Sequence, residues 1–134
     1  MAQKLGIGDR VILTGYRTDV ADFYKMADVF LFPSFREGLP VSVMEAMASG
    51  LPVIATKIRG SSDIVKDKQN GILLQPNDVK KFANAINAIC NNEMSCLMAL
   101  ENEKAAEIFD LSNILKQYQE AYFNVGEENN EWVY

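Results

Sequence analysis

The hydrophobic residues in the central part of the chain predict a strand, a helix and a second strand in succession. Residues 29–32 are all apolar and rich in β-formers, and the run ends at Pro33. An uninterrupted apolar run of this length is typical of a strand that is buried on both faces in a parallel sheet. Residues 41–49 carry helix formers until Gly50, which suits a left-handed helix end, and residues 53–55 form a second apolar run. The pattern therefore predicts a β-α-β crossover.

The same pattern predicts further strands and helices around this unit. The β-branched run from Val11 to Thr14 predicts a strand before the crossover, and residues 72–74 predict one after it. Helices are expected over residues 20–27, capped by Asp19; from Asp78 onward; and, in two segments, between residues 93 and 125. We therefore expect one α/β domain over residues 1–134, with a parallel sheet of about four strands flanked by helices.

Glu45 is the only carboxylate in the predicted central helix, where its neighbours are small or apolar. Because side chains on a helix lean toward its N-terminus, Glu45 should reach back toward the loop that holds Glu37. A helix N-terminus offers free amides and the positive end of the helix dipole, so it suits a phosphate group. Phosphate and carboxylate repel each other, and the consistent arrangement has a diphosphate on the amides and neutral hydroxyls on the two glutamates. A sugar-nucleotide is a ligand of this kind.

A second interpretation of Glu45 needs no ligand. Ser42 and Glu45 have the spacing of a capping box, in which the glutamate only accepts a hydrogen bond from a backbone amide at the helix start. Pro40 argues against this interpretation, because a proline in the first helical position would make Leu39 the cap and would place Ser42 inside the helix. On these residues alone both interpretations stay open.

Composition and charge exclude several functions. The chain has 134 residues, 49% of them hydrophobic, and a formal net charge of -5, which opposes binding to nucleic acid and to anionic membrane surfaces. No apolar run approaches a membrane span, and the first residues lack the apolar core of a secretory signal, so we expect a cytoplasmic protein. The chain has no histidine, and Cys90 and Cys96 lie in no ligand-like cluster. We expect reduced cysteines, no metal site and no cofactor.

Five motifs follow one another along the chain. Glu37 and Glu45, with seven residues between them, lie within EGLPVSVMEAMASGLPVIAT. The others are VILTGYR at residues 11–17, YKMADVFLFPS at residues 24–34, Gly60 ahead of Asp63, and NGILLQP at residues 70–76. In this order and spacing, roughly residues 5–125 resemble the donor-site region of retaining GT-B glycosyltransferases of family 4. The resemblance implies a partial Rossmann-like fold, corresponding to the later part of the C-terminal, nucleotide-sugar-binding domain of such enzymes.

The resemblance also implies roles for individual residues. Glu37 would hold hydroxyls of the donor hexose as the catalytic residue, and Glu45 would hold the ribose. The backbone after Glu37 would receive the sugar and the distal phosphate, and two hydroxyl residues would line the cleft. The loop after the first predicted strand would border the nucleobase, although for Arg17 an ordinary solvated loop is the other interpretation. The implied donor-binding residues are Gly15, Tyr16, Arg17, Ser34, Glu37, Gly38, Leu39, Pro40, Val41, Glu45 and Thr56.

Enzymes of this kind transfer a hexose from UDP-hexose or GDP-hexose to a saccharide or lipid-linked acceptor, with retention of configuration and without a metal. The resemblance implies a part in cell-surface polysaccharide synthesis, within a larger enzyme that is peripheral to the inner face of the membrane. The glycine-rich loop, the diphosphate-binding Arg and Lys, and the acceptor domain of such enzymes match nothing in this chain. We therefore expect the chain alone to be inactive. The alternative is a non-catalytic remnant that binds nucleotide-sugars or associates with itself.

The strand from Val11 to Thr14 carries an expectation about association. If this strand takes the fourth place in the doubly wound order 3-2-1-4-5-6, its neighbour, the first strand, is not encoded here. The strand would then be a bare sheet edge with apolar side chains, and Arg10 would be its only charged residue. Pairing with a second copy would cover it, which predicts a homodimer. The alternative is a monomer in which residues 1–8 or the C-terminal segment cover the edge.

Overall fold

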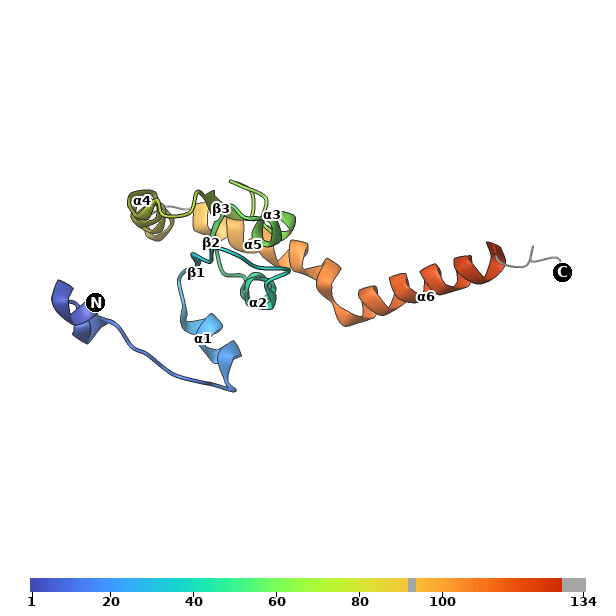
Figure 1. Ribbon diagram of the computed structural model, residues 1–134, viewed down its shortest axis with the longest axis horizontal. Helices are drawn as coiled ribbons and strands as arrows, with labels where there is room; N and C mark the ends of the chain where they lie inside the picture. The colour runs from blue at the N-terminus through green and yellow to red at the C-terminus, as the bar shows by residue number, and fades with distance from the viewer. Residues whose placement is uncertain (92–93, 129–134) are drawn as a thin grey trace.

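The computed structural model describes residues 1–91 and 94–128, without the side chains of residues 94–96 and 124–128. Its sheet has three parallel strands in the order β1-β2-β3, namely β1 (Phe30–Phe32), β2 (Val53–Thr56) and β3 (Gly71–Leu74) (Figure 1). Every residue of β2, the middle strand, is buried. Helix α2 (Val41–Ala48) connects β1 to β2, and these two strands are parallel. The predicted β-α-β crossover is confirmed.

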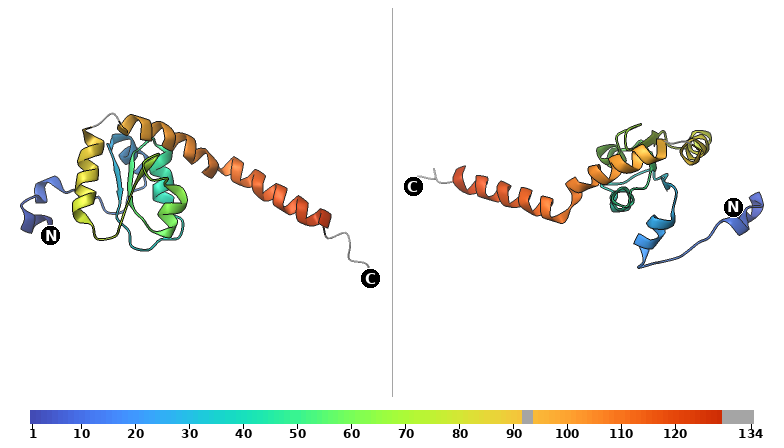
Figure 2. Two further views of the ribbon diagram at one scale, coloured as in Figure 1. Left: turned by 90° about the horizontal axis from the view of Figure 1, so that it is seen from above. Right: turned by 180° about the vertical axis from the view of Figure 1, so that it is seen from behind.

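Helices pack on both faces of this sheet (Figure 2). They are α2, α3 (Arg59–Ile64), α4 (Val79–Cys90) and α5 (Met94–Ala106). Since side chains alternate along a strand, Val53 and Ala55 of β2 join a buried cluster with α2 on one face, and Ile54 joins a second cluster with α4 on the other. Met98 of α5 belongs to the second cluster, while Ala105 packs against the first. A Rossmann-like arrangement of helices on both sides of a parallel sheet is therefore present.

Three local signals in the sequence explain where these elements begin and end. Asp78 caps α4 as predicted, because its carboxylate accepts a hydrogen bond from the Lys81 amide at 3.2 Å. Helix α2 ends before Gly50, which has the left-handed φ of 74° that its position predicts. Buried Asn102 of α5 then fixes the following turn, since its side-chain amide donates to the Leu51 carbonyl at 2.6 Å. The β1-α2-β2 unit is thus held in place from α5.

The remaining elements are η1 (Ala2–Leu5), η2 (Gly8–Arg10), α1 (Val20–Met26), η3 (Glu107–Phe109) and α6 (Leu111–Glu128). Of these, α1 contributes buried Tyr24 to the first cluster and η3 packs Phe109 against it, while η1, η2 and the described part of α6 contribute to neither cluster. Helix α6 extends away from the sheet, and Figures 1 and 2 both show it projecting beyond the rest of the chain. None of the described helices is long and apolar enough to cross a membrane. Cys90, at the end of α4, is exposed and free, and the side chain of Cys96 lies outside the described residues.

The predicted strand from Val11 to Thr14 is wrong. These residues form no strand and pair with no other, and Ile12 and Leu13 are 84% and 92% exposed. The sequence has the composition of a strand, but a strand exists only where a partner accepts its backbone hydrogen bonds. The sheet consequently has three strands where about four were expected.

The place assigned to this segment in the strand order is also wrong. Strands β1, β2 and β3 lie side by side in chain order, as strands 4, 5 and 6 do in the order 3-2-1-4-5-6. In that order the third strand, which precedes the fourth in the chain, is three strand spacings, about 14 Å, away from it. Figure 1 shows the N-terminal segment standing away from β1 in this way. The unpaired sheet edge on this side, among the described residues, is therefore β1 and not residues 11–14.

Candidate functional site

The N-terminus of α2 lies at the carboxyl edge of the sheet, directly after the loop that follows β1. Pro40 is the N-cap, with an extended ψ of 105°, and its carbonyl accepts hydrogen bonds from the amides of Val43 and Met44. The amides of Val41 and Ser42 therefore have no acceptor within the helix, as is usual for the first turn. Free amides at the positive end of the helix dipole make this turn suited to an anionic group.

The cap geometry decides between the two interpretations of Glu45. We expected Pro40 in the first helical position with Leu39 as the cap, but the helix begins at Val41 and Pro40 is the cap. The extended ψ of Pro40 explains this shift of one residue. Ser42 lies inside the helix in either case, and no side chain caps α2. The capping-box interpretation is excluded by this geometry.

The carboxylate of Glu45 contacts α1 instead. Its Oε2 accepts a hydrogen bond from the Tyr24 hydroxyl at 3.0 Å, so the side chain does lean back from α2, as expected. Tyr24 is 8% exposed, whereas the side chain of Glu45 is exposed, although its neighbours in the helix are small or apolar. Burial of the Tyr24 ring, followed by the hydrogen bond and the charge of Glu45, raises the pKa of Tyr24 to about 12. No described residue donates a hydrogen bond to the other oxygen of Glu45, which is available to a ligand.

Glu37 is held from the end of β1. The Ser34 hydroxyl donates to Oε1 of Glu37 at 2.7 Å, and the Glu37 side chain is exposed. Thr56, at the end of β2, was expected to line the cleft but is 1% exposed. Its hydroxyl lies 2.5 Å from the Ser34 carbonyl oxygen and 3.1 Å from that of Phe32, so it holds the backbone at the end of β1. The structure thus brings Ser34, Glu37 and Thr56 together.

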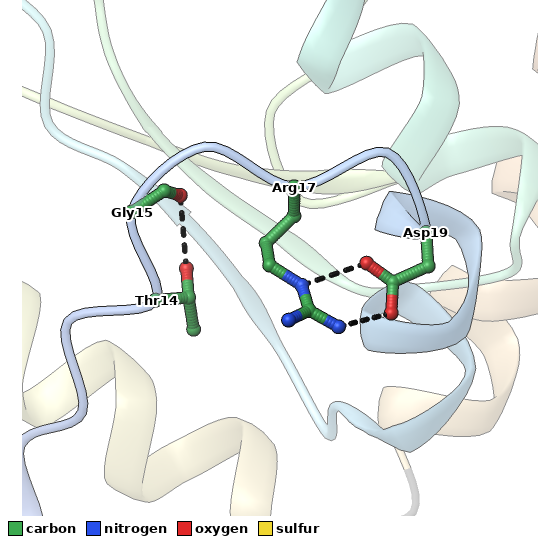
Figure 3. Close-up of polar contacts among 4 residues, drawn as sticks. All are labelled: Thr14, Gly15, Arg17 and Asp19. Carbon is green, nitrogen blue, oxygen red and sulfur yellow. Dashed lines mark hydrogen bonds and ion pairs between the residues drawn. The ribbon is translucent and has the colours of Figure 1, made fainter.

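The loop from Gly15 to Arg17 is a separate feature (Figure 3). Gly15 has a left-handed φ of 64°, and Tyr16 is 94% exposed. Two nitrogens of the Arg17 guanidinium bind the carboxylate of Asp19, at 2.7 Å from Nε and 2.5 Å from Nη2, and the guanidinium lies 5.5 Å from the centre of the Phe23 ring. Hydrogen bonding to Asp19 raises the pKa of Arg17, and the same contact lowers the pKa of Asp19.

This pairing changes the roles expected of both residues. Asp19 occupies the N-cap position of α1 but makes no capping hydrogen bond, because its carboxylate is engaged by Arg17. The charge of Arg17 is already balanced, so the arginine is poorly placed to neutralise a phosphate. The solvated-loop interpretation of Arg17 fits the structure better than phosphate contact does.

An open hollow of about 660 Å³ lies beside α2, between this helix and the segment from α5 to α6. Leu39, Val41 and Glu45 line one side of it. The opposite side carries three further carboxylates, those of Glu103, Glu107 and Asp110. Among the described residues no lysine or arginine lines the hollow, so it is unsuited to a diphosphate. The amides of α2 and the two glutamates are thus the better candidates for donor contacts.

Comparisons with known proteins agree with this geometry. The family described as "Glycosyl transferases group 1" matches residues 1–106. The chain is 34% identical, over 71% of its length and 24% of the relative's, to the UDP-Gal:alpha-D-GlcNAc-diphosphoundecaprenol alpha-1,3-galactosyltransferase of Escherichia coli.

Solved structures with the GT-B fold are similar over nearly the whole chain. Sucrose-phosphate synthase from Thermosynechococcus elongatus is 28% identical, with a TM-score of 0.86 over 96% of this chain and 33% of that protein. Alr3699/HepE of Anabaena in complex with UDP-glucose is also 28% identical, with a TM-score of 0.85 over 92% of this chain and 35% of that protein. The chain thus spans about a quarter to a third of the length of each of these three proteins. It belongs to the group 1 family of glycosyl transferases.

Proposed function

We propose that this chain is the donor-binding part of a glycosyltransferase, which transfers a hexose from a nucleotide-sugar to a saccharide or lipid-linked acceptor with retention of configuration. The observation that carries the proposal is the pair of exposed glutamates, of which Glu37 precedes and Glu45 follows the free amides of α2 in the chain. UDP-hexose is favoured over GDP-hexose as the donor, since Alr3699/HepE, which this chain resembles, has been solved with UDP-glucose.

In this proposal each donor group meets a group of matching chemistry. Glu37 accepts hydrogen bonds from hexose hydroxyls, and the second oxygen of Glu45 accepts one from the ribose. The amides of Gly38, Leu39 and Val41 receive the distal phosphate, and they stabilise the charge that develops on the leaving diphosphate. Pro40 has no amide hydrogen and only shapes the turn. Gly15 and Tyr16 border the nucleobase.

In this proposal the chain acts within a larger enzyme that provides further parts of the active site. We propose a role in cell-surface polysaccharide synthesis, at a cytoplasmic location on the inner face of the membrane. The cations for the diphosphate and the acceptor site would come from the rest of such an enzyme, so the chain alone should bind donor but not transfer it. The alternative remains a non-catalytic module that binds nucleotide-sugars.

Titration calorimetry of the 134-residue chain with UDP-glucose, UDP-galactose, GDP-mannose and free UDP tests this proposal. We expect heat of binding from at least one sugar-nucleotide. We also expect no transfer from radiolabelled donors to lipid or sugar acceptors by the purified chain. The absence of binding to every sugar-nucleotide would contradict the donor-binding role. Acceptor-dependent transfer by the chain alone would contradict its dependence on a larger enzyme.

Self-association is a further expectation for the isolated chain. Residues 11–14 are not a sheet edge, but the exposure of Ile12 and Leu13 leaves apolar surface that a second copy can cover. We propose a homodimer with this segment at or near the interface, and Ile12→Lys should shift it to monomer. Val79→Lys, at an equally apolar and exposed position of α4, is the matched control and should leave the dimer intact. A monodisperse wild-type monomer at micromolar concentration in light scattering would contradict the prediction.

A further inference from the structure

Two contacts hold Glu37 in place, and each starts from a buried residue, Thr56 in the first and Gly60 in the second. The first runs through hydroxyl groups. Buried Thr56 holds the carbonyl of Ser34 at 2.5 Å, and the hydroxyl of Ser34 holds Oε1 of Glu37 at 2.7 Å. The single hydrogen of the Thr56 hydroxyl is directed to backbone carbonyls at the end of β1, so it is not available to a ligand.

The second contact is a close approach of two backbones. A Cβ atom at Gly60 would lie 1.7 Å from the carbonyl oxygen of Gly38, 2.8 Å from its carbonyl carbon and 3.2 Å from the carbonyl oxygen of Glu37. Real Cβ atoms do not approach backbone this closely, so any other residue at position 60 must push the loop away. Gly60 is buried near the start of α3, and its φ is not in the left-handed region. Glycine is therefore required here by space.

We propose that Thr56 and Gly60 are positioning residues for Glu37. Thr56 fixes the end of β1, from which the Ser34 hydroxyl reaches the carboxylate, and Gly60 lets the backbone of residues 37–38 lie directly against α3. Thr56 is the last residue of β2 and Gly60 follows it in the chain, so the carboxyl end of the central strand sets the position of an exposed carboxylate. The identity of the ligand rests on the proposed function, whereas the positioning itself does not.

A positioning role of Thr56 differs from a purely structural role in its effect on binding of the sugar. If Glu37 holds only the hexose, displacing it should weaken the binding of UDP-glucose and leave the binding of free UDP unchanged. If Thr56 had a purely structural role, Thr56→Val would weaken the binding of both ligands equally or would change neither. Since a hydrogen bond to a charged group is at stake, we expect roughly a tenfold loss for UDP-glucose and less than a twofold change for UDP.

The test compares Thr56→Val, which removes the hydroxyl at nearly constant volume, with Thr56→Ser, which keeps it. Ser49→Ala is the matched control, because it also removes a hydroxyl bonded to a backbone carbonyl, at 2.9 Å, but at the far end of α2. NMR spectra of the ligand-free proteins report the amide resonances of Glu37 and Gly38, and calorimetry reports the affinities for UDP-glucose and UDP. Ser34→Ala and Gly60→Ala supply the same measurements if Thr56→Val does not fold.

We expect Thr56→Val to move the Glu37 and Gly38 resonances and to weaken the binding of UDP-glucose but not of UDP. Thr56→Ser and Ser49→Ala should have the resonances and affinities of the wild type. Unchanged resonances in Thr56→Val, or an equal loss of affinity for both ligands, would overturn the inference. If the wild type binds no sugar-nucleotide, the proposed function fails on its own. The resonances then decide the positioning: it stands if Thr56→Val moves them and Thr56→Ser does not, and it falls otherwise.

Discussion

Replacing Glu45 with glutamine should weaken the binding of UDP-glucose by roughly 1.5–3 kcal/mol, about tenfold or more. The change removes the charge that strengthens a hydrogen bond from the ribose hydroxyl. In the wild type the Tyr24 hydroxyl donates a hydrogen bond to Glu45 at 3.0 Å. The carbonyl oxygen of a glutamine can still accept this hydrogen bond, so the helix packing should survive. Calorimetric titration at constant ionic strength measures the loss, and thermal unfolding confirms that the variant is folded.

Two comparison variants sharpen this result. Arg17→Gln should change the affinity much less than Glu45→Gln does, because the guanidinium is already paired with Asp19. Glu120→Gln changes the net charge by the same amount on exposed α6 and should have no effect. If Glu45→Gln binds UDP-glucose like the wild type, or if Arg17→Gln lowers the affinity as much as Glu45→Gln does, the proposed roles of these residues are wrong.

The free energy of unfolding should fall by about 2 kcal/mol more in the wild type than in Tyr24→Phe as the pH rises from 10 to 12. In the folded protein the pKa of Tyr24 is raised to about 12, mainly by burial, while in the unfolded chain it stays near 10. Between these values the unfolded state has lost the tyrosine proton and the folded state retains it. The stability that depends on this proton is therefore complete below pH 10 and is lost as the pH rises through 12.

Urea unfolding of both proteins at several pH values between 9 and 12 measures this difference. The other ionisable groups are common to both proteins, so their contributions cancel in the comparison. Tyr24→Phe should be less stable than the wild type at pH 9, because it lacks the hydrogen bond to Glu45, and the gap should close as the pH rises. Parallel curves for the two proteins would show that the Tyr24 hydroxyl is not buried against Glu45.

The central unit of the fold could be predicted because its signals are local. The apolar runs of β1 and β2, the helix formers of α2 and the left-handed Gly50 each act over a few residues. The segment at residues 11–14 carries an equally strong local signal and still forms no strand. Strand formation depends on a neighbouring strand, and the sequence of a segment does not contain its neighbour.

The candidate site was predictable to a similar depth. The spacing of Glu37 and Glu45 and the position of Pro40 identified the helix terminus and both carboxylates. The partner of Glu45, Tyr24, depends on how α1 packs against α2, which no spacing rule describes. The pairs Ser34–Glu37 and Arg17–Asp19, three and two residues apart, are contacts that a local rule could have found.

The amides whose resonances respond to a donor show where on the chain the donor binds. Uniformly ¹⁵N-labelled chain would be titrated with UDP-glucose, and backbone resonances would be followed across the described residues. A donor site at the N-terminus of α2 predicts that the amides of Gly38, Leu39, Val41, Ser42 and Glu45 move together with one dissociation constant, while those of α4 stay in place. Saturating UDP-glucose that moves none of these amides, or that moves only amides remote from the N-terminus of α2, would contradict a donor site on this helix.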